Sequence, residues 1–374
     1  MRKPSFAIAG AGLGGLTAAI ALQRAGYECK VYEQAPAIGR VGAGINIAPN
    51  STRMFAALGL GDALRRVGIE PQCKLSRNWQ TADVMFSVPV AELTEIYGAP
   101  FLAFHRAELH TVLASALKDG TVELGKRLER VSDDGASMRL TFDNGSSVEA
   151  DAVIGADGVH SKVREYTIDE EILSYHGLVA YRAIVQRDAV DAPLDDNTKW
   201  WAPDRYVMVY FLSEKRDQVH FVASTPEPLG ASLAPSEADF EIFYAAFNGF
   251  HQNVRTLLRA ATNVTRWPLI EGRTFSPWFK RKAVLLGDAC HATTPHMGQG
   301  AGMAFEDALV LVRCIQQSEQ DLERAFAKYE HNRRERTARI QFESHENRWT
   351  KSSMDHKWVY GYDAMKAPLQ DPPS

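Results

Sequence analysis

The stretch that decides the fold is residues 5–33, SFAIAGAGLGGLTAAIALQRAGYECKVYE. It begins with the apolar run Phe6–Ala9, passes through the glycine-rich GAGLGG at 10–15, and continues with small and apolar residues over Leu16–Ala25. This order predicts a buried strand, a tight turn and a helix. A second apolar run, Cys29–Tyr32, predicts a strand parallel to the first, so the whole segment is expected to form a βαβ unit.

The glycines of this turn indicate what the unit binds. Gly10, Gly12 and Gly15 allow a tight turn, a close approach of pyrophosphate to the backbone, and close packing of the helix on the sheet. The amide groups at the start of the helix attract phosphate. Glu33, at the end of the second strand, can accept hydrogen bonds from both hydroxyls of an adenosine ribose and would repel a 2′-phosphate. We therefore expect a dinucleotide, FAD or NAD rather than NADP.

Two more predicted strands end in similar turns. Ala152–Ile154 runs into GADG at 155–158, and Ala283–Leu286 runs into Gly287-Asp288. The second turn continues into PHMGQGAG at 295–302, just before another predicted helix. An aspartate at a strand end can hold a sugar-like hydroxyl, while glycines and a helix N-terminus can approach an electron-rich or anionic ring. A flavin, with its ribityl chain and ring, satisfies both requirements.

The composition excludes several classes of protein. The chain has 374 residues, 45% of them hydrophobic, and 42 Lys and Arg against 46 Asp and Glu, which is typical of a globular protein with a large core and disfavours nucleic acid as a partner. The cysteines have no paired spacing for a metal site or a redox dithiol, so we expect reduced thiols, no metal and a cytoplasmic protein. Ser5–Leu22 carries no charge, but its glycines favour the strand-turn-helix interpretation over a membrane span.

The middle and the end of the chain have their own patterns. Val179–Val185, Tyr206–Leu212 and Gln218–Ala223 alternate like strands of an antiparallel sheet. Val122–Leu128 and Met138–Phe142 are expected to form a hairpin around Asp143-Asn-Gly145. From about residue 301 to 349 the pattern is helical. There, four arginines alternate with glutamates, which favours a solvated helix with ion pairs over a basic binding patch: Arg333, Arg334, Arg336, Arg339, Glu330, Glu335 and Glu343.

In order and spacing, Gly10–Gly15 with Glu33, Gly155–Gly158, and Gly287 through Asp307 resemble the three fingerprints of the single-component FAD-dependent aromatic hydroxylases. The resemblance implies an α/β protein with a Rossmann-like FAD-binding domain, an inserted antiparallel β-sheet substrate domain and a long C-terminal helix, the para-hydroxybenzoate hydroxylase-like fold. The expected FAD domain comprises residues 1–75, 100–165 and 275–374, and the expected substrate domain comprises residues 76–99 and 166–274.

The resemblance also implies the cofactors and the residues that bind them. FAD is expected to be bound tightly but non-covalently, with NADH, rather than NADPH, as a transient co-substrate. Asp157, with Gly158, would serve flavin and nicotinamide exchange. The expected cofactor-binding residues are Gly10, Gly12, Gly15, Glu33, Gln34, Arg40, Gly44, Arg106, Asp157, Asp288, Pro295, Gly298, Gly300 and Ala301.

The implied reaction is hydroxylation of a hydroxylated aromatic or pyridine carboxylate with dioxygen that reduced flavin has activated. The ring must be electron-rich, so the site needs a group that takes the proton of the ring hydroxyl. His296 and Tyr210 are the expected catalytic residues, His296 because imidazole titrates near the working pH. Asn46 and Tyr206 are expected to face the substrate with them, and Arg182 and Arg205 are candidates for binding its carboxylate.

Within the family, Arg40, Gly42–Ile45, Trp200-Trp201 and Trp358–Asp363 resemble members that convert 6-hydroxynicotinate to 2,5-dihydroxypyridine with loss of carbon dioxide. The chain departs from them at Asn46 and Tyr206, where histidine is expected, so the substrate is either that acid or a chemical relative of it.

Three competing functions stay open at this point: salicylate-type or hydroxybenzoate-type hydroxylation, a flavin dehydrogenase or reductase, and a non-enzymatic NAD-binding module. No membrane partner is expected, and the chain is expected to be a monomer or a homodimer.

Overall fold

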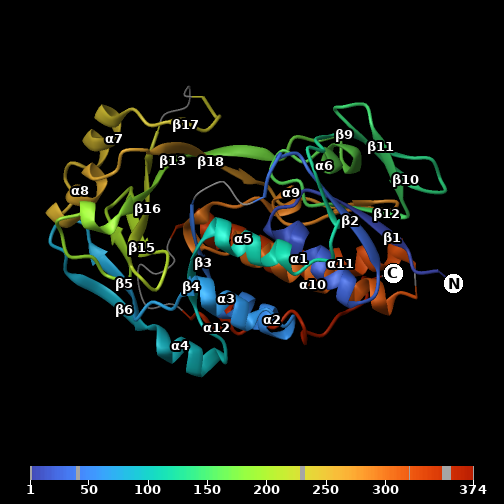
Figure 1. The fold of residues 1–374 in the computed structure, drawn as a ribbon, viewed down its shortest axis with the longest axis horizontal. Coiled ribbons are helices and arrows are strands. Elements are labelled where there is room, and N and C mark those ends of the chain that lie inside the picture. The colour runs from blue at the N-terminus through green and yellow to red at the C-terminus, as the bar shows by residue number, and fades with distance from the viewer. Residues whose placement is uncertain (1, 39–42, 228–231, 320, 348–354, 374) are drawn as a thin grey trace.

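Segment 5–33 forms the centre of a mostly parallel sheet at one end of the molecule (Figure 1). The computed structural model describes the chain except residues 1, 39–42, 228–231, 320, 348–354 and 374. In spatial order the six strands of this sheet are β19 (Phe279–Lys280), β20 (Ala283–Leu285), β12 (Ala152–Gly155), β1 (Ser5–Ala9), β2 (Glu28–Glu33) and β8 (Val122–Leu124).

The strand order brings the three glycine-containing turns together. β1 pairs in parallel with β12 on one side and with β2 on the other, and β12 pairs in parallel with β20. The loops that follow β1, β12 and β20 therefore leave the same edge of the sheet side by side. The predicted βαβ unit and both later strands are confirmed, with the first helix, α1 (Leu13–Arg24), starting three residues earlier than expected.

Close backbone contacts explain two of the glycines. Gly10 has φ +97°, and a Cβ there would lie 2.4 Å from the carbonyl oxygen of Ala156 in the loop after β12. A Cβ on Gly15 would lie 2.0 Å from the carbonyl oxygen of Gly10. Around Gly12, by contrast, no atom would lie within 4 Å of a Cβ, so the side of the turn at this residue is open.

The second large sheet lies at the end of the molecule opposite to both termini (Figure 1). In spatial order its eight strands are β17 (Ser236–Glu237), β18 (Thr265–Gly272), β13 (Leu173–Gln186), β16 (Gln218–Pro226), β15 (Tyr206–Phe211), β14 (Asn197–Trp201), β5 (Cys73–Asn78) and β6 (Val84–Pro89). The predicted antiparallel pairing of β13, β15 and β16 is confirmed. The expected division of the chain into two domains by residue ranges stays a prediction.

Alternation along these strands gives the sheet two different faces. Tyr181, Val207 and Phe221 point to one face and join a core with Phe243 of α7 (Phe240–Phe247) and Leu257 of α8 (Gln252–Arg259). Their neighbours along the chain point to the opposite face, which looks toward the parallel sheet and lines the cavity described below.

The remaining elements frame the sheets. The smaller sheets are β11 (Ser147–Ala150), β10 (Met138–Phe142) and β9 (Leu128–Asp133), and β3 (Gly44–Ile47), β7 (Leu102–His105) and β4 (Gly68–Ile69). The other helices are α2 (Pro49–Ala57), α3 (Gly61–Val67), α4 (Val90–Tyr97), α5 (Arg106–Ser115), α6 (Lys162–Thr167), α9 (Asp288–His291), α10 (Gly300–Gln317), α11 (Leu322–His345) and α12 (Lys357–Tyr360), with 3₁₀ turns η1 (Arg187–Ala189) and η2 (Pro295–Met297).

One local expectation was wrong. The turn at Asn144-Gly145 joins β10 to β11, and β10 pairs with β9, because residues 122–124 join the parallel sheet as β8 instead. The predicted C-terminal helical region is confirmed as two helices, α10 and the longer α11. Among the described residues, no helix combines the length and apolar character needed to cross a bilayer.

The glycine contacts generate a matched test of the fold. Gly15→Ala should lower the free energy of unfolding of the cofactor-free protein by about 1–3 kcal/mol, the usual cost of overpacking, because its Cβ would overlap the Gly10 carbonyl. Gly12→Ala adds the same methyl group to open space and should leave the melting temperature unchanged. Thermal unfolding of both variants checks this, and equal melting temperatures would contradict the proposed packing.

Candidate active site

A cavity of about 470 Å³ lies between the loops at the edge of the parallel sheet and the inner face of the eight-stranded sheet. It brings together residues from almost the whole length of the chain. The sequence-predicted site residues that line it are Gly12, Gly44, Asn46, Arg106, Tyr206, Tyr210, Asp288, Pro295, His296, Gly298, Gly300 and Ala301.

Other predicted residues lie outside this lining. Gly10 and Gly15 pack closely against neighbouring backbone atoms rather than facing the cavity. Gln34 is exposed just after β2. The carboxylate of Glu33 accepts hydrogen bonds of 2.8 Å from the backbone N–H groups of Ala11 and Ala35, so it holds the first turn to the end of β2. Arg40 lies outside the described residues, as does Gly42 of the motif that follows it.

Asp157 has a helix-capping position. Its carboxylate accepts hydrogen bonds from the hydroxyl of Ser161 at 2.5 Å and from the backbone N–H of Lys162 at 2.7 Å, at the start of α6. Burial raises the pKa of Asp157 despite these bonds. This carboxylate does not line the cavity, whereas the neighbouring Gly158 does.

One end of the cavity has the donor set of a dinucleotide site. Gly12 presents its open side there, next to the first amides of α1, and the side chain of Arg106 lies nearby. Gly300 and Ala301 bring the N-terminus of α10 to the same cavity. The Asp288 side chain is exposed on the cavity wall, and desolvation by the surrounding protein raises its pKa.

A buried ion cluster holds the corner after β20. Asp307 of α10 accepts a hydrogen bond of 3.1 Å from the backbone N–H of Gly287 and contacts Nε2 of His291 at 2.5 Å. Its other oxygen accepts from Nε of Arg333 on α11 at 2.7 Å. Burial alone would raise the pKa of Asp307, but the charges of His291 and Arg333 lower it to about 2. His291 therefore supports the corner after β20.

The neighbouring Glu306 extends this cluster to the loop before α10. Its carboxylate accepts from Arg333 at 2.8 Å, from Arg336 at 2.8 Å and from the amide of Asn50 at 2.8 Å. The same Asn50 amide donates to Gln299 at 3.0 Å. The expectation of a solvated arginine-rich helix was therefore wrong for Arg333, which is fully buried, and for Arg336, whose side chain is 11% exposed. Exposed Arg334, paired with Glu330 at 3.3 Å, does follow it.

The other end of the cavity is the inner face of the eight-stranded sheet. Arg182 on β13, Val222 on β16, Met208 on β15 and Lys199 on β14 lie directly opposite one another in register, and all four line the cavity. The next row along is His220, Tyr210 and Asn197. With adjacent strands about 4.8 Å apart, the backbones of the two cations are separated by roughly 14 Å, so a ring can fit between their long side chains.

Arg182 has no acidic partner among the residues that the structure describes. Its guanidinium lies 5.5 Å from the ring of Trp267, and its Nε makes no hydrogen bond there. Burial lowers the pKa of Arg182, and burial together with the Arg182 charge lowers the pKa of His220 to about 3. A half-buried cation that has no acidic partner among the described residues indicates a site for an anion.

Lys199 is a cavity residue that the sequence interpretation missed. Its ammonium group donates to Asn347 at 3.2 Å and lies over the rings of Trp201 at 3.9 Å and Tyr206 at 4.1 Å. Burial raises the pKa of the Tyr206 and Tyr210 phenols, which therefore remain protonated hydrogen-bond donors. Lys199 belongs to no recognisable sequence motif, so its place in the cavity could be predicted only from the register of the strands.

His296 faces the same end of the cavity from η2. Its Nδ1 lies 2.8 Å from the backbone carbonyl of Ser344, so Nδ1 carries the proton and Nε2 carries the lone pair. Nε2 has no hydrogen-bond partner among the described residues. Burial, with the nearby charge of Lys199, lowers the pKa of His296 to about 3. The expectation that this imidazole titrates near the working pH was therefore wrong, because it is buried, and His296 is a neutral acceptor.

Of the remaining sequence candidates, Asn46 lines the cavity and Arg205 does not. Asn46 lines the cavity and accepts a hydrogen bond of 3.3 Å from Asn197. Arg205 does not line it, because its guanidinium binds Asp204 at 2.8 Å and the carbonyl oxygen of Ala246 at 2.6 Å. Of the two arginine candidates, only Arg182 is in place to meet a ligand.

Comparison with known proteins gives consistent matches. A family model described as FAD binding domain matches residues 4–344. The chain is 42% identical to 6-hydroxynicotinate 3-monooxygenase of Bordetella bronchiseptica, covering 98% of this chain and 97% of the relative. It is 40% identical to the protein of the same name from Pseudomonas fluorescens, covering 99% and 98%. The solved structure of Klebsiella pneumoniae HpxO complexed with FAD and uric acid superimposes with a TM-score of 0.82 and 29% identity, covering 92% of this chain and 87% of that one.

The ion cluster generates a test of the framework behind the site. Arg333→Met leaves Glu306 and Asp307 short of their buried partner and should lower the free energy of unfolding by about 3–5 kcal/mol. Arg334→Met removes only a half-exposed pair with Glu330 and should cost about 0.3–0.5 kcal/mol. Chemical unfolding of both variants measures the difference, and equal losses would contradict a supporting role for the cluster.

Proposed function

The chain belongs to the family described as FAD binding domain, and on this premise we propose that it is an FAD-dependent monooxygenase that hydroxylates a small aromatic or pyridine carboxylate. The observation that carries the proposal is a single cavity with two different ends. One end has the glycine turn and helix N-termini that suit a dinucleotide, and the other has Arg182, a half-buried cation without an acidic partner among the described residues, which suits an anionic substrate.

The residues at the first end fit FAD. The open side of Gly12 leaves room for the pyrophosphate beside the amides of α1 and the charge of Arg106. Asp288 would hold the ribityl chain, while Gly300 and the N-terminus of α10 would meet the flavin ring. Glu33 lies outside the cavity lining, where it holds the first turn, and its binding of the adenosine ribose stays a prediction. Bound FAD, reduced by NAD(P)H, supplies the activated oxygen that is transferred to the substrate ring.

Arg182 is proposed to bind the substrate carboxylate. It is a half-buried cation on the inner face of the sheet, and no acid among the described residues neutralises it. A carboxylate there would restore charge balance and orient the ring between Arg182 and Lys199. The protonated phenols of Tyr206 and Tyr210 can donate hydrogen bonds to the same substrate.

His296 is proposed to accept the hydrogen bond and then the proton of the ring hydroxyl at Nε2. The bond from Nδ1 to Ser344 fixes the tautomer in which Nε2 is free to do this. Removal of that proton pushes electron density onto the carbons ortho and para to the oxygen, where the ring must be attacked. Arg182 and Lys199 favour the resulting ring anion, and the apolar lining at Phe86 and Phe101 keeps water away.

The first substrate to test is 6-hydroxynicotinate, because it is the compound in the names of both relatives and satisfies the charge pattern of the cavity. Its carboxylate lies para to the hydroxyl and can leave as carbon dioxide after oxygen has added. Oxygen and NADH would then be consumed, and 2,5-dihydroxypyridine, carbon dioxide, water and NAD⁺ released. A cytoplasmic location, NADH as the preferred donor, and a monomer or homodimer remain predictions.

One observation favours a second reaction. A carboxylate held by Arg182 loses a charge-assisted contact worth about 1.5–3 kcal/mol when it becomes neutral carbon dioxide. This contact favours a substrate that keeps its carboxylate, as in hydroxybenzoate-type hydroxylation. Asn46 and Tyr206, which differ from the histidines expected in the 6-hydroxynicotinate subgroup, point the same way.

The function is tested on the purified protein. We expect a flavin absorption spectrum, oxidation of NADH that a hydroxylated ring acid accelerates, and a hydroxylated product in amounts comparable to the NADH consumed. A panel with 6-hydroxynicotinate, salicylate and hydroxybenzoates separates the candidate substrates, and carbon dioxide analysis separates the two reactions. Protein without bound flavin, or substrate oxidation that needs no dioxygen, would contradict the proposal.

The role of Arg182 has a matched test. Arg182→Gln should raise KM for the accepted ring acid by about tenfold to a hundredfold, which corresponds to loss of one charge-assisted hydrogen bond. The same substitution should have little effect with an analogue that lacks the carboxylate. Arg205→Gln, whose parent side chain binds Asp204 outside the cavity, should leave both KM values unchanged. Equal effects of Arg182→Gln on the acid and the analogue would contradict the assignment.

A further inference from the structure

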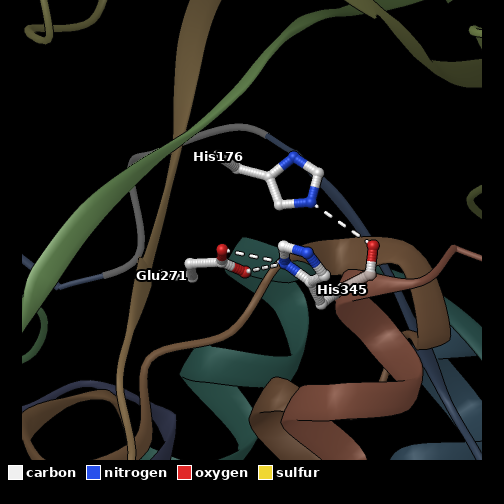
Figure 2. Close-up of side chains that lie close together, drawn as sticks. All are labelled: His176, Glu271 and His345. Carbon is white, nitrogen blue, oxygen red and sulfur yellow. Dashed lines mark hydrogen bonds and ion pairs between the residues drawn. The ribbon is translucent and has the colours of Figure 1, made fainter.

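Three side chains that play no part in the proposed function meet next to η2, the turn that carries His296. They are His176 of β13, Glu271 of β18 and His345 at the end of α11, and Figure 2 shows them pointing toward one another. One ligand atom of each lies within 4.8 Å of the other two. The cluster therefore joins two strands and a helix that are distant in sequence.

The strand irregularity that places His176 is specific. β13 and β18 pair regularly up to Tyr175, and their register then shifts before pairing resumes at Val179. His176 lies in this bulge, next to Gly177 with φ +88°. A bulge turns a side chain away from the direction that regular alternation would give it, and such features occur beside functional sites. Glu271 lies opposite Ser174, just before the shift.

Some nitrogen and oxygen atoms of the cluster are able to coordinate a metal ion. Nδ1 of His345 lies 2.9 Å and 3.2 Å from the two carboxylate oxygens of Glu271, so the Nδ1–H of His345 donates a hydrogen bond to this carboxylate. Nε2 of His176 faces the backbone carbonyl of His345 at 3.4 Å, and Nδ1 of His176 is buried with no partner among the described residues. The side chain of His345 is 54% exposed, so the cluster can be reached from solvent.

We propose that His176, Glu271 and His345 bind a divalent transition-metal ion of the Zn²⁺ class. Two imidazoles and one carboxylate are a donor set that zinc accepts, with a fourth position left for water. With metal–ligand bonds of about 2.1 Å, tetrahedral ligand atoms lie roughly 3.4 Å apart, so the widest separation in the cluster must contract by up to about 1.4 Å. The ion would replace the proton between His345 and Glu271, which is released to solvent.

The site lies beside the cavity rather than inside it. The ring of His176 is 5.4 Å from the ring of His296 and 4.8 Å from that of His345. Nδ1 of His296 is bonded to the carbonyl of Ser344, the residue before His345. The ion would therefore lie on the side of His296 that faces away from the cavity, and the negative charge of Glu271 would partly balance its charge.

The proposal is tested by equilibrium dialysis of the FAD-loaded, full-length protein against Zn²⁺ after removal of metals with a chelator. We expect saturable binding of one ion per chain. Glu271→Gln and His345→Ala should each weaken binding by about tenfold or more. His331→Ala removes an imidazole from the same helix, outside the cluster, and should bind as the parent does. Crystals soaked in Zn²⁺ should show anomalous scattering between the three side chains.

The result that would overturn the proposal is equally direct. No saturable binding by the folded parent protein, or one-ion binding that survives both Glu271→Gln and His345→Ala, would exclude this site. Circular dichroism confirms that each variant is folded, and Glu271→Gln preserves the size of the side chain if His345→Ala is unstable. Because dialysis needs no turnover, failure here leaves the proposed monooxygenase function untouched, and failure of that function leaves this site untouched.

Discussion

Two adjacent buried carboxylates fix the positions of α10, α11 and the two loops at one end of the cavity. Glu306 and Asp307 are fully buried in α10, where ionised groups cost several kcal/mol each unless they are paired. Arg333 and Arg336 of α11 supply the pairing. Since Asp307 also holds the backbone of Gly287, and Asn50 links Glu306 to Gln299, the α10–α11 contact fixes both loops at the dinucleotide end.

The same cavity then combines two opposite electrostatic demands. At the edge of the parallel sheet, amides and Arg106 favour phosphate, while on the inner face of the eight-stranded sheet Arg182 and Lys199 favour an anionic ring. Between them the neutral His296 can accept a proton only as negative charge develops beside it, because burial otherwise disfavours the imidazolium. An electron-rich hydroxylated acid meets these demands better than a neutral ring.

Local sequence pattern was sufficient for the elements and insufficient for their long-range contacts. The βαβ unit and the three turns after β1, β12 and β20 were predicted because apolar runs and glycines report on neighbouring residues. The burial of Arg333, the cavity position of Lys199 and the helix-capping bonds of Asp157 depend on partners far along the chain or on exact register. The neutral state of His296 likewise depends on burial, which residue type alone does not reveal.

The most direct measurement follows the origin of the oxygen that enters the ring. Turnover of the accepted ring acid under isotopically labelled dioxygen in unlabelled water should place the label in the new hydroxyl of the product, with one labelled atom per molecule. A product whose new oxygen comes from water, or a reaction that continues without dioxygen, would contradict the assignment of this cavity to oxygen transfer.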